Sequence, residues 1–219
     1  LATLSFNFGV KPTTPGGLRG WSWEELSLAE VAVPADAVIG ASVGGVAVFR
    51  RHFSEYRPLV AATCLGAAAA CVDHWVESLL ARSEEGRAMR DSDLERVGDL
   101  RGKVVMALSG LITGAAHPAG VDPSWSKMAK AQAVETSLEV ARTAARQMGA
   151  EGFEADHPVR RIVRDLEAFE HAEGTPDPLA RAGLRGTFEA LGVSLVGHDG
   201  VAFDAARHGA EIVPLESLN

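Results

Sequence analysis

The tripeptide Glu173-Gly174-Thr175 places an acid, a glycine and a hydroxyl in succession at the end of an amphipathic segment that starts at His157. The apolar side chains of that segment recur at helical spacing, which predicts a short helix ending on the tripeptide. Because Gly174 tolerates backbone conformations that other residues resist, we expect a sharp bend there. A carboxylate fixed beside a bend can face a cleft and remove a proton from a substrate. A solvated Glu before a C-capping glycine is the other interpretation, and these residues alone favour it.

Composition and charge limit the classes of protein to which this chain can belong. Its 219 residues suffice for one domain or one and a half, and a net charge of −8 argues against nucleic-acid or anionic-membrane partners. We identify no apolar run long enough to span a bilayer and no signal peptide. Cys64 and Cys71, inside one apolar stretch, are interpreted as buried thiols of a cytoplasmic protein. The histidines are scattered, so no metal site is expected.

The pattern of apolar residues predicts a mainly α-helical protein in three parts. Residues 1–42 are expected to be the end of a middle β-domain, residues 43–182 a helical bundle, and residues 183–219 a short helix followed by a β-hairpin tail. In the first part, Leu1–Val10 and Trp21–Val33 are β-leaning and flank a turn-rich segment. A lone strand pair is marginal in water, so these strands imply a sheet completed by other residues.

Several helical segments are expected in the bundle and its tail. Residues 46–81 form one long helix or two stacked ones, since Pro58 suggests a boundary or a bend. The acidic tripeptide Asp91–Asp93 can cap the helix that follows. Further helices are expected at residues 123–148, 158–173 and 179–191. Their short or glycine-rich connections indicate an up-and-down bundle.

Four separated segments together resemble the C-terminal half of the acyl-CoA dehydrogenase family. V-P-A-D-A-V-I-G (Val33–Gly40) is similar to the family's junction between its middle β-domain and its helical domain. F-S-E-Y-R-P-L-V-A-A (Phe53–Ala62) is similar to the start of its first long helix. Q-M-G-A-E-G-F (Gln147–Phe153) resembles its glycine-rich turn, and H-P-V-R-R-I-V-R-D followed by E-G-T resembles its catalytic corner. The four segments occur in the family's order and cover residues 1 to about 182.

The resemblance implies an FAD-dependent oxidoreductase that converts an acyl-CoA or acyl-carrier thioester to its α,β-enoyl form. Glu173 would remove the α-proton while the β-hydrogen leaves as hydride to flavin N5, and the Glu173 backbone N–H would help bind the thioester oxygen. Arg57 would lie near this carboxylate, and Thr175 near the flavin. Arg82 would contact the flavin pyrophosphate of a neighbouring subunit, and Gly149 would line the cofactor wall.

Several residues depart from the family pattern around the expected cofactor wall. Glu85 stands where an aromatic residue is usual, Ala150 replaces the second glycine of the turn, and Arg146 occupies the position expected for Gln. Ala172 replaces a frequent aromatic residue before the catalytic acid. A carboxylate near a pyrophosphate would weaken dinucleotide binding by charge repulsion. A non-catalytic scaffold or interaction subunit that binds no flavin by itself is therefore the alternative function.

The N-terminal helical domain of the family and most of its β-domain have no counterpart in this sequence. We expect either a fragment of a longer protein or one subunit of a split enzyme. In both cases the chain would join a homo- or hetero-oligomer in which another chain or segment supplies the N-terminal half. Because the missing parts form most of the acyl pocket, the sequence assigns no acyl length or branching.

The tail carries a second resemblance. Residues Phe188–Ala210, with Phe203, Asp204 and His208 in an F-D-x-x-x-H spacing, resemble the small β-domain of GrpE, a nucleotide exchange factor of bacterial chaperones. The same stretch predicts a β-hairpin that turns at His198–Gly200. A hairpin unrelated to GrpE explains the pattern equally well.

Overall fold

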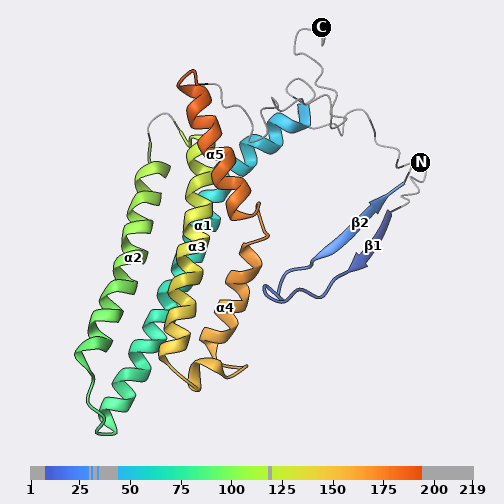
Figure 1. Cartoon of the computed structure of the whole chain (residues 1–219). Helices are drawn as coiled ribbons and strands as arrows, with labels where there is room; N and C mark the ends of the chain where they lie inside the picture. The colour runs from blue at the N-terminus through green and yellow to red at the C-terminus, as the bar shows by residue number, and fades with distance from the viewer. Residues whose placement is uncertain (1–7, 30, 32–33, 35–43, 118–119, 194–219) are drawn as a thin grey trace, which may run out of the picture.

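The chain folds into a helical bundle with a small β-hairpin beside it (Figure 1). The computed structural model describes residues 8–29, 31, 34, 44–117 and 120–193. The α-helices are α1 (Gly44–Glu84), α2 (Asp91–Ala115), α3 (Pro123–Gln147), α4 (Pro158–Phe169) and α5 (Pro176–Ala190), with a 3₁₀ helix, η2, at Glu151–Phe153. Helices α1, α2 and α3 alternate in direction, and α4 and α5 follow one another in the direction of α2 (Figure 1). The expected mainly α-helical bundle is confirmed.

The core lies along α3, which contacts each of the other four α-helices. An apolar stripe that runs from Ala131 of this helix to its C-cap residue, Met148, is buried. Fully buried side chains from the neighbouring helices face it: Leu65, Val72 and Trp75 from α1, Leu100 from α2, and Val159, Val163 and Leu166 from α4. Burying one such aliphatic side chain contributes about 1.5–3 kcal/mol, so α1, α3 and α4 form a rigid frame. The candidate site stands on these three helices.

Helix α1 is a single helix that continues through Pro58. Proline has no backbone N–H and clashes with the preceding turn, which usually bends a helix. Figure 1 shows α1 changing direction in its N-terminal part. Of the two alternatives expected at Pro58, a boundary between helices or a bend within one helix, the bend is therefore correct.

Helix α1 also corrects the expectation about membrane spans. It is long and apolar enough to cross a bilayer by length and composition, with a mean hydropathy of 1.5 over its most apolar 18 residues. Of that window, 44% is buried inside the bundle. The buried helix of a protein core has this composition too, because its apolar side chains face other helices.

Local sequence fixes the helix starts close to the site. Asp122 accepts hydrogen bonds from the backbone N–H groups of Ser124 and Trp125, and Pro123 takes the first position of α3. At α2, a single residue of the expected capping tripeptide, Asp93, makes the capping contacts. Asp93 accepts from the backbone N–H of Arg90 at 3.3 Å and from the Arg90 guanidinium at 2.9 Å and 3.0 Å. Asp93 therefore caps from inside the helix, at its third position.

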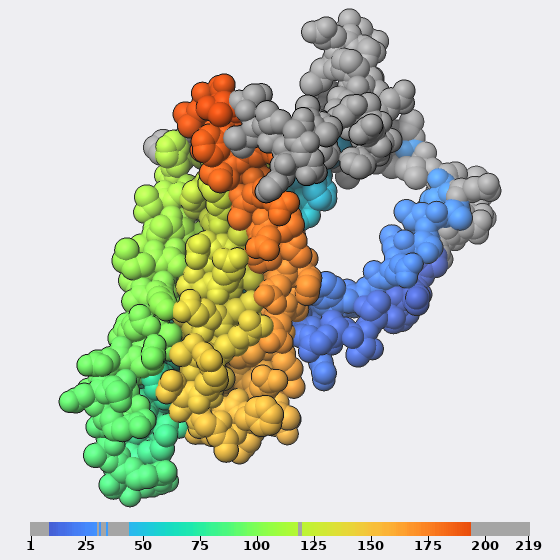
Figure 2. Space-filling view, viewed as in Figure 1, coloured from blue at the N-terminus to red at the C-terminus, as the bar shows by residue number. Residues whose placement is uncertain are grey.

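The β-hairpin pairs strands β1 (Phe8–Pro12) and β2 (Glu24–Leu28) antiparallel. Its register places Phe8 opposite Leu28 and Pro12 opposite Glu24. Every residue of β2 is exposed, and Figure 2 shows the strands standing away from the bundle. Both strands are shorter than the β-leaning stretches of the sequence, and Leu1–Val10 lies mostly outside the described residues.

The turn of the hairpin docks on α4 through very close contacts. A Cβ atom on Gly17 would lie 1.9 Å from the backbone oxygen of Arg164, so only glycine fits there. Next to it, the backbone N–H of Leu18 donates to Asp165 Oδ1 at 2.6 Å. The Trp21 ring packs edge-to-face against the Phe169 ring, with 6.0 Å between ring centroids. The β-segment is thus attached to the helix that leads into Glu173.

The tail after Val193 lies outside the described residues. The expected hairpin and most of the GrpE-like stretch fall there and stay predictions. The part boundaries expected at residues 42/43 and 182/183 stay predictions as well.

Candidate functional site

Glu173 lies in a tight turn between α4 and α5, and its place differs from the expected one. Helix α4 ends at Phe169, four residues earlier than expected, because the chain turns at residues 170–173. Glu173 itself has a φ of 60°, in the left-handed region, and Gly174 follows with a φ of 99°. A non-glycine residue in this region costs roughly 1–3 kcal/mol and persists only where its surroundings enforce it. The strain therefore belongs to the acid, and Gly174 continues the bend as expected.

The carboxylate of Glu173 is the candidate acid–base group of this turn. Its Oε2 atom is buried, and it has no hydrogen-bond partner among the residues that the structure describes. Burying a polar atom without a partner costs free energy, so such atoms are rare away from functional sites. An acceptor oxygen that is shielded from water and has no donor beside it can take a proton from a bound molecule.

Arg57 reaches this turn from α1, as expected, but it contacts the backbone of Glu173. Its Nε donates to the Glu173 backbone oxygen at 3.3 Å. The guanidinium lies 5.2 Å from the centroid of the Phe53 ring, within the range of a cation–π contact. Partial burial lowers the pKa of Arg57, and the nearby Glu173 charge raises it. Arg57 therefore remains a cation and places positive charge next to the acid.

Lys130 is the residue of this site that the sequence analysis missed. It is fully buried in α3, and its Nζ donates to the backbone oxygen of Phe169 at 2.8 Å and to that of Gly174. Burial lowers the pKa of Lys130 to about 8; Arg57 adds to this shift, while Cys64 and two Glu carboxylates oppose it. One signal in the sequence was available: Lys130 falls one turn before Val134, on the buried stripe of α3.

A cavity of about 500 Å³ opens beside Arg57 at the N-terminal end of the bundle. Phe49, Phe53 and Ser54 of α1 line it with Pro123 and Lys127 of α3. Its wall combines aromatic rings with positive charge. Such a wall suits a ligand that has both an apolar chain and anionic groups.

The three residues expected to bind a cofactor separate into two places. Thr175 is exposed and immediately precedes α5, beside Glu173. Arg82 lies near the C-terminal end of α1, where its Nε and Nη2 donate to the backbone oxygen and the hydroxyl of Ser78. The Ser78 hydroxyl in turn donates to Glu151 of η2 at 2.6 Å. Arg82 is therefore tied to the glycine-rich turn, at the opposite end of α4 from Glu173 (Figure 1).

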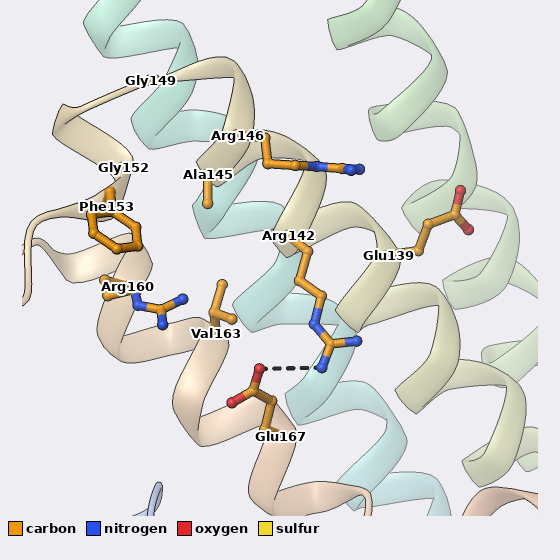
Figure 3. A pocket seen from close by; sticks show the side chains of 10 residues that line it. All are labelled: Glu139, Arg142, Ala145, Arg146, Gly149, Gly152, Phe153, Arg160, Val163 and Glu167. Atoms are coloured by element: carbon orange, nitrogen blue, oxygen red, sulfur yellow. Dashed lines mark hydrogen bonds and ion pairs between the residues drawn. The ribbon is translucent and has the colours of Figure 1, made fainter.

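Gly149 borders a second cavity, of about 590 Å³, between α3, η2 and α4 (Figure 3). Its φ is 68°, and a Cβ atom there would meet no other atom within 4 Å. Arg142 turns toward Glu167 across the cavity, with 3.1 Å between Nη2 and Oε1, and the Arg160 guanidinium lies over the Phe153 ring (Figure 3). The surroundings of Gly149 are therefore rich in arginine.

The cysteines and histidines of the described residues form no cluster that could hold a metal ion. Cys64 and Cys71 are fully buried free thiols, and burial raises the pKa of both to about 12. A thiol with so high a pKa is a poor nucleophile and a poor metal ligand. Within residues 8–29, 31, 34, 44–117 and 120–193, no group of three or more His, Cys, Asp or Glu side chains could hold a metal ion.

Comparison with known proteins matches the helical part of the chain to a protein family. The family description "Acyl-CoA dehydrogenase, C-terminal domain" matches residues 44–185. Cyclohexane-1-carbonyl-CoA dehydrogenase from Geobacter metallireducens is 28% identical over 163 residues, covering 72% of this chain and 43% of that protein. An acyl-CoA dehydrogenase from Bacillus subtilis is 28% identical over 183 residues, covering 77% and 48%.

Solved structures agree at the level of the fold. Butyryl-CoA dehydrogenase from Megasphaera elsdenii superposes with a TM-score of 0.74 and 21% identity, covering 85% of this chain and 50% of that one. Glutaryl-CoA dehydrogenase from Mycobacterium smegmatis gives 0.74 and 20%, covering 89% and 51%. The chain therefore spans about half the length of the relatives it matches.

Proposed function

The chain belongs to the acyl-CoA dehydrogenase family, and from this membership we propose that it is the C-terminal part of an FAD-dependent enzyme that desaturates acyl thioesters. The single observation that carries the proposal is the Glu173 carboxylate: a buried oxygen without a described partner, on a backbone held in a strained turn. Structural glutamates are usually solvated or paired, so this arrangement favours a chemical role.

In the proposed reaction, Glu173 removes the proton from the α-carbon of the substrate. That proton is very weakly acidic, so the base needs close placement and the thioester carbonyl needs polarisation. The turn supplies the placement, and the backbone N–H of Glu173 is the proposed donor to the thioester oxygen. Arg57 and Lys130 flank the turn with positive charge. Arg57 donates to the backbone oxygen of Glu173, and Lys130 donates to those of Phe169 and Gly174.

The residues expected around FAD fit such a cofactor. Thr175 is an exposed residue two positions after Glu173, and Gly149 leaves open space where a Cβ atom would stand. The bonds of Arg82 to Ser78 use two of the five donors of a guanidinium. We propose that Thr175 lies near the flavin of its own site, and that Arg82 and Gly149, at the other end of α4, line the site of a neighbouring subunit. Bound FAD supplies the acceptor for the β-hydrogen, at N5.

The proposed substrate is an acyl-CoA or an acyl-carrier thioester. The 500 Å³ cavity beside Arg57 has the aromatic and basic wall that an apolar chain with anionic groups requires. Because the chain spans about half the length of its relatives, we propose that the remaining walls come from an N-terminal half. That half belongs either to the same longer polypeptide or to a partner chain in a homo- or hetero-oligomer.

The test uses the full assembly that contains this chain, with saturating FAD, an acyl-CoA and an artificial electron acceptor. Replacing Glu173 with Gln keeps the shape of the side chain and removes the base, so kcat should fall by about 10²–10⁴-fold. Flavin absorbance should stay unchanged. Glu154→Gln, on the exposed surface, is the matched control and should keep the wild-type rate.

Two results would reject the proposal. A Glu173→Gln enzyme with the wild-type rate would show that another group is the base. A colourless assembly that takes up no flavin at saturating FAD would favour the scaffold alternative. The departures from the family pattern at Glu85 and Arg146 would then agree with the loss of the cofactor.

A further inference from the structure

Lys130 joins the two ends of the turn that carries Glu173. Its side chain is fully buried, a rare position for lysine unless the ammonium finds partners. One partner, the backbone oxygen of Phe169 at 2.8 Å, belongs to the last residue of α4. The other is the backbone oxygen of Gly174, the residue directly after Glu173. A single side chain of α3 therefore fixes the turn on both sides of the acid.

We propose that Lys130 is a positioning residue for proton transfer, which keeps the backbone of Glu173 left-handed and its carboxylate directed at the α-proton. This inference rests on the proposed role of Glu173 as the base. Lys130 acts through Glu173 and does not touch the substrate.

The backbone oxygens of the turn explain why an anchor is needed. Glu173 has a φ of 60°, a conformation that a residue with a side chain keeps only where its surroundings over-determine it. Arg57 of α1 holds the Glu173 oxygen, and Lys130 of α3 holds the next oxygen, on Gly174. Two cations on two different core helices thus fix consecutive peptide groups, and the strained residue cannot relax without breaking one of these bonds.

The charges around Lys130 indicate that its hydrogen bonds matter more than its charge. Cys64 and Arg57 face it from α1, and Glu170 and Glu173 face it from the turn. Burial lowers the pKa of Lys130 to about 8. Both the ammonium and the neutral amine have enough N–H groups for two carbonyl oxygens. Deprotonated Lys130 can therefore keep both hydrogen bonds, and the pH profile of kcat should show no change near pH 8 that depends on Lys130.

The experiment compares three variants of the full FAD-loaded assembly with an acyl-CoA substrate. Lys130→Met keeps the length of the side chain without its donors, and kcat should fall about 10²-fold because the base is misplaced, with KM within about twofold. Lys130→Arg keeps donors and should recover part of kcat. Lys103→Met removes a partly exposed lysine of α2 that pairs with Glu139, and should behave as wild type.

Two further readouts separate positioning from a general role in folding. Hydrogen–deuterium exchange should accelerate at residues 170–175 in Lys130→Met and remain unchanged in the core of α1. The pH profile of kcat should keep its shape and lose only amplitude. If Lys130→Met does not fold, Lys130→Gln, which retains one short donor group, is measured in the same way.

Several outcomes would overturn the inference. One is a kcat of Lys130→Met equal to that of wild type, and another is faster hydrogen–deuterium exchange over the whole bundle. A change of the wild-type kcat near pH 8 that is absent from the variant would also overturn it, as would failure of both the Met and Gln variants to fold. If Glu173→Gln is active, the proposed function fails together with this inference. If Glu173→Gln is inactive and Lys130→Met is fully active, only this inference fails.

Discussion

Raising the pH from 7 to 10 should increase the contribution that one buried residue, Lys130, makes to the free energy of unfolding. Burial lowers its pKa from an ordinary 10.5 to about 8 in the folded protein. Between these two values the unfolded chain binds more protons at this site than the folded chain, so stability increases with pH. A difference of that size corresponds to roughly 2.5 kcal/mol gained over this pH range. This stability is gained because deprotonation of Lys130 removes the cost of burying an ammonium ion.

The cysteines act in the opposite direction above pH 9. Burial raises the pKa of Cys64 and Cys71 from 9.0 to about 12, so their thiols ionise in the unfolded chain first. Unfolding then releases protons, and stability decreases as the pH rises through this window. Comparison with Lys130→Met removes most of this background, because that variant retains both thiols.

The assay is urea unfolding of the full chain and of Lys130→Met at a series of pH values from 7 to 10. The difference in the free energy of unfolding between the two proteins should change in favour of wild type by about 2–3 kcal/mol across the series. Lys103→Met again serves as the control, since Lys103 lies on α2 and pairs with Glu139 and not with the turn that carries Glu173. A wild-type minus variant difference that stays flat from pH 7 to 10 would refute the reasoning.

Two further predictions concern the elements that hold the site. Gly17→Ala should destabilise the chain by about 1–3 kcal/mol, since its Cβ would overlap the Arg164 backbone. Gly20→Ala is the control and should be neutral, because no atom lies within 4 Å of the position of its Cβ. Equal urea midpoints for the two variants would contradict the docking of the turn. Asp122→Ala should cost about 1 kcal/mol by removing the cap of α3. An unchanged thermal midpoint would show that this cap is not needed.

The helices could be predicted because their signals are local. The stripe of α3 repeats at helical spacing, and its burial follows from that repeat alone. The end of α4 could not be predicted in the same way. Phe169 completes the apolar stripe, and nothing in the four residues after it distinguishes a last helical turn from a tight turn. The continuation of α1 through Pro58 also depends on packing, because the neighbouring helices bury that stretch on both sides of the proline.

The candidate site was only partly predictable, for a different reason. Glu173 and Arg57 were found through their resemblance to a family motif, and the structure brings them together. Lys130 has no motif, because its partners are backbone oxygens 39 and 44 residues further along the chain. A carbonyl oxygen is present in every residue, so no residue type marks it as the partner of a buried cation.

The arrangement of charge around Glu173 also explains how an acid without a described hydrogen-bond partner can remain in a folded protein. The two cations beside it donate to backbone oxygens of the turn and leave Glu173 Oε2 without a donor. Their charges still act on the carboxylate through space, since electrostatic interactions at a partly buried site are weakly screened. In the proposed role of Glu173, a direct ion pair would occupy the oxygen that accepts the proton. Cations bonded to the neighbouring peptide groups instead stabilise the turn and leave that oxygen without a partner.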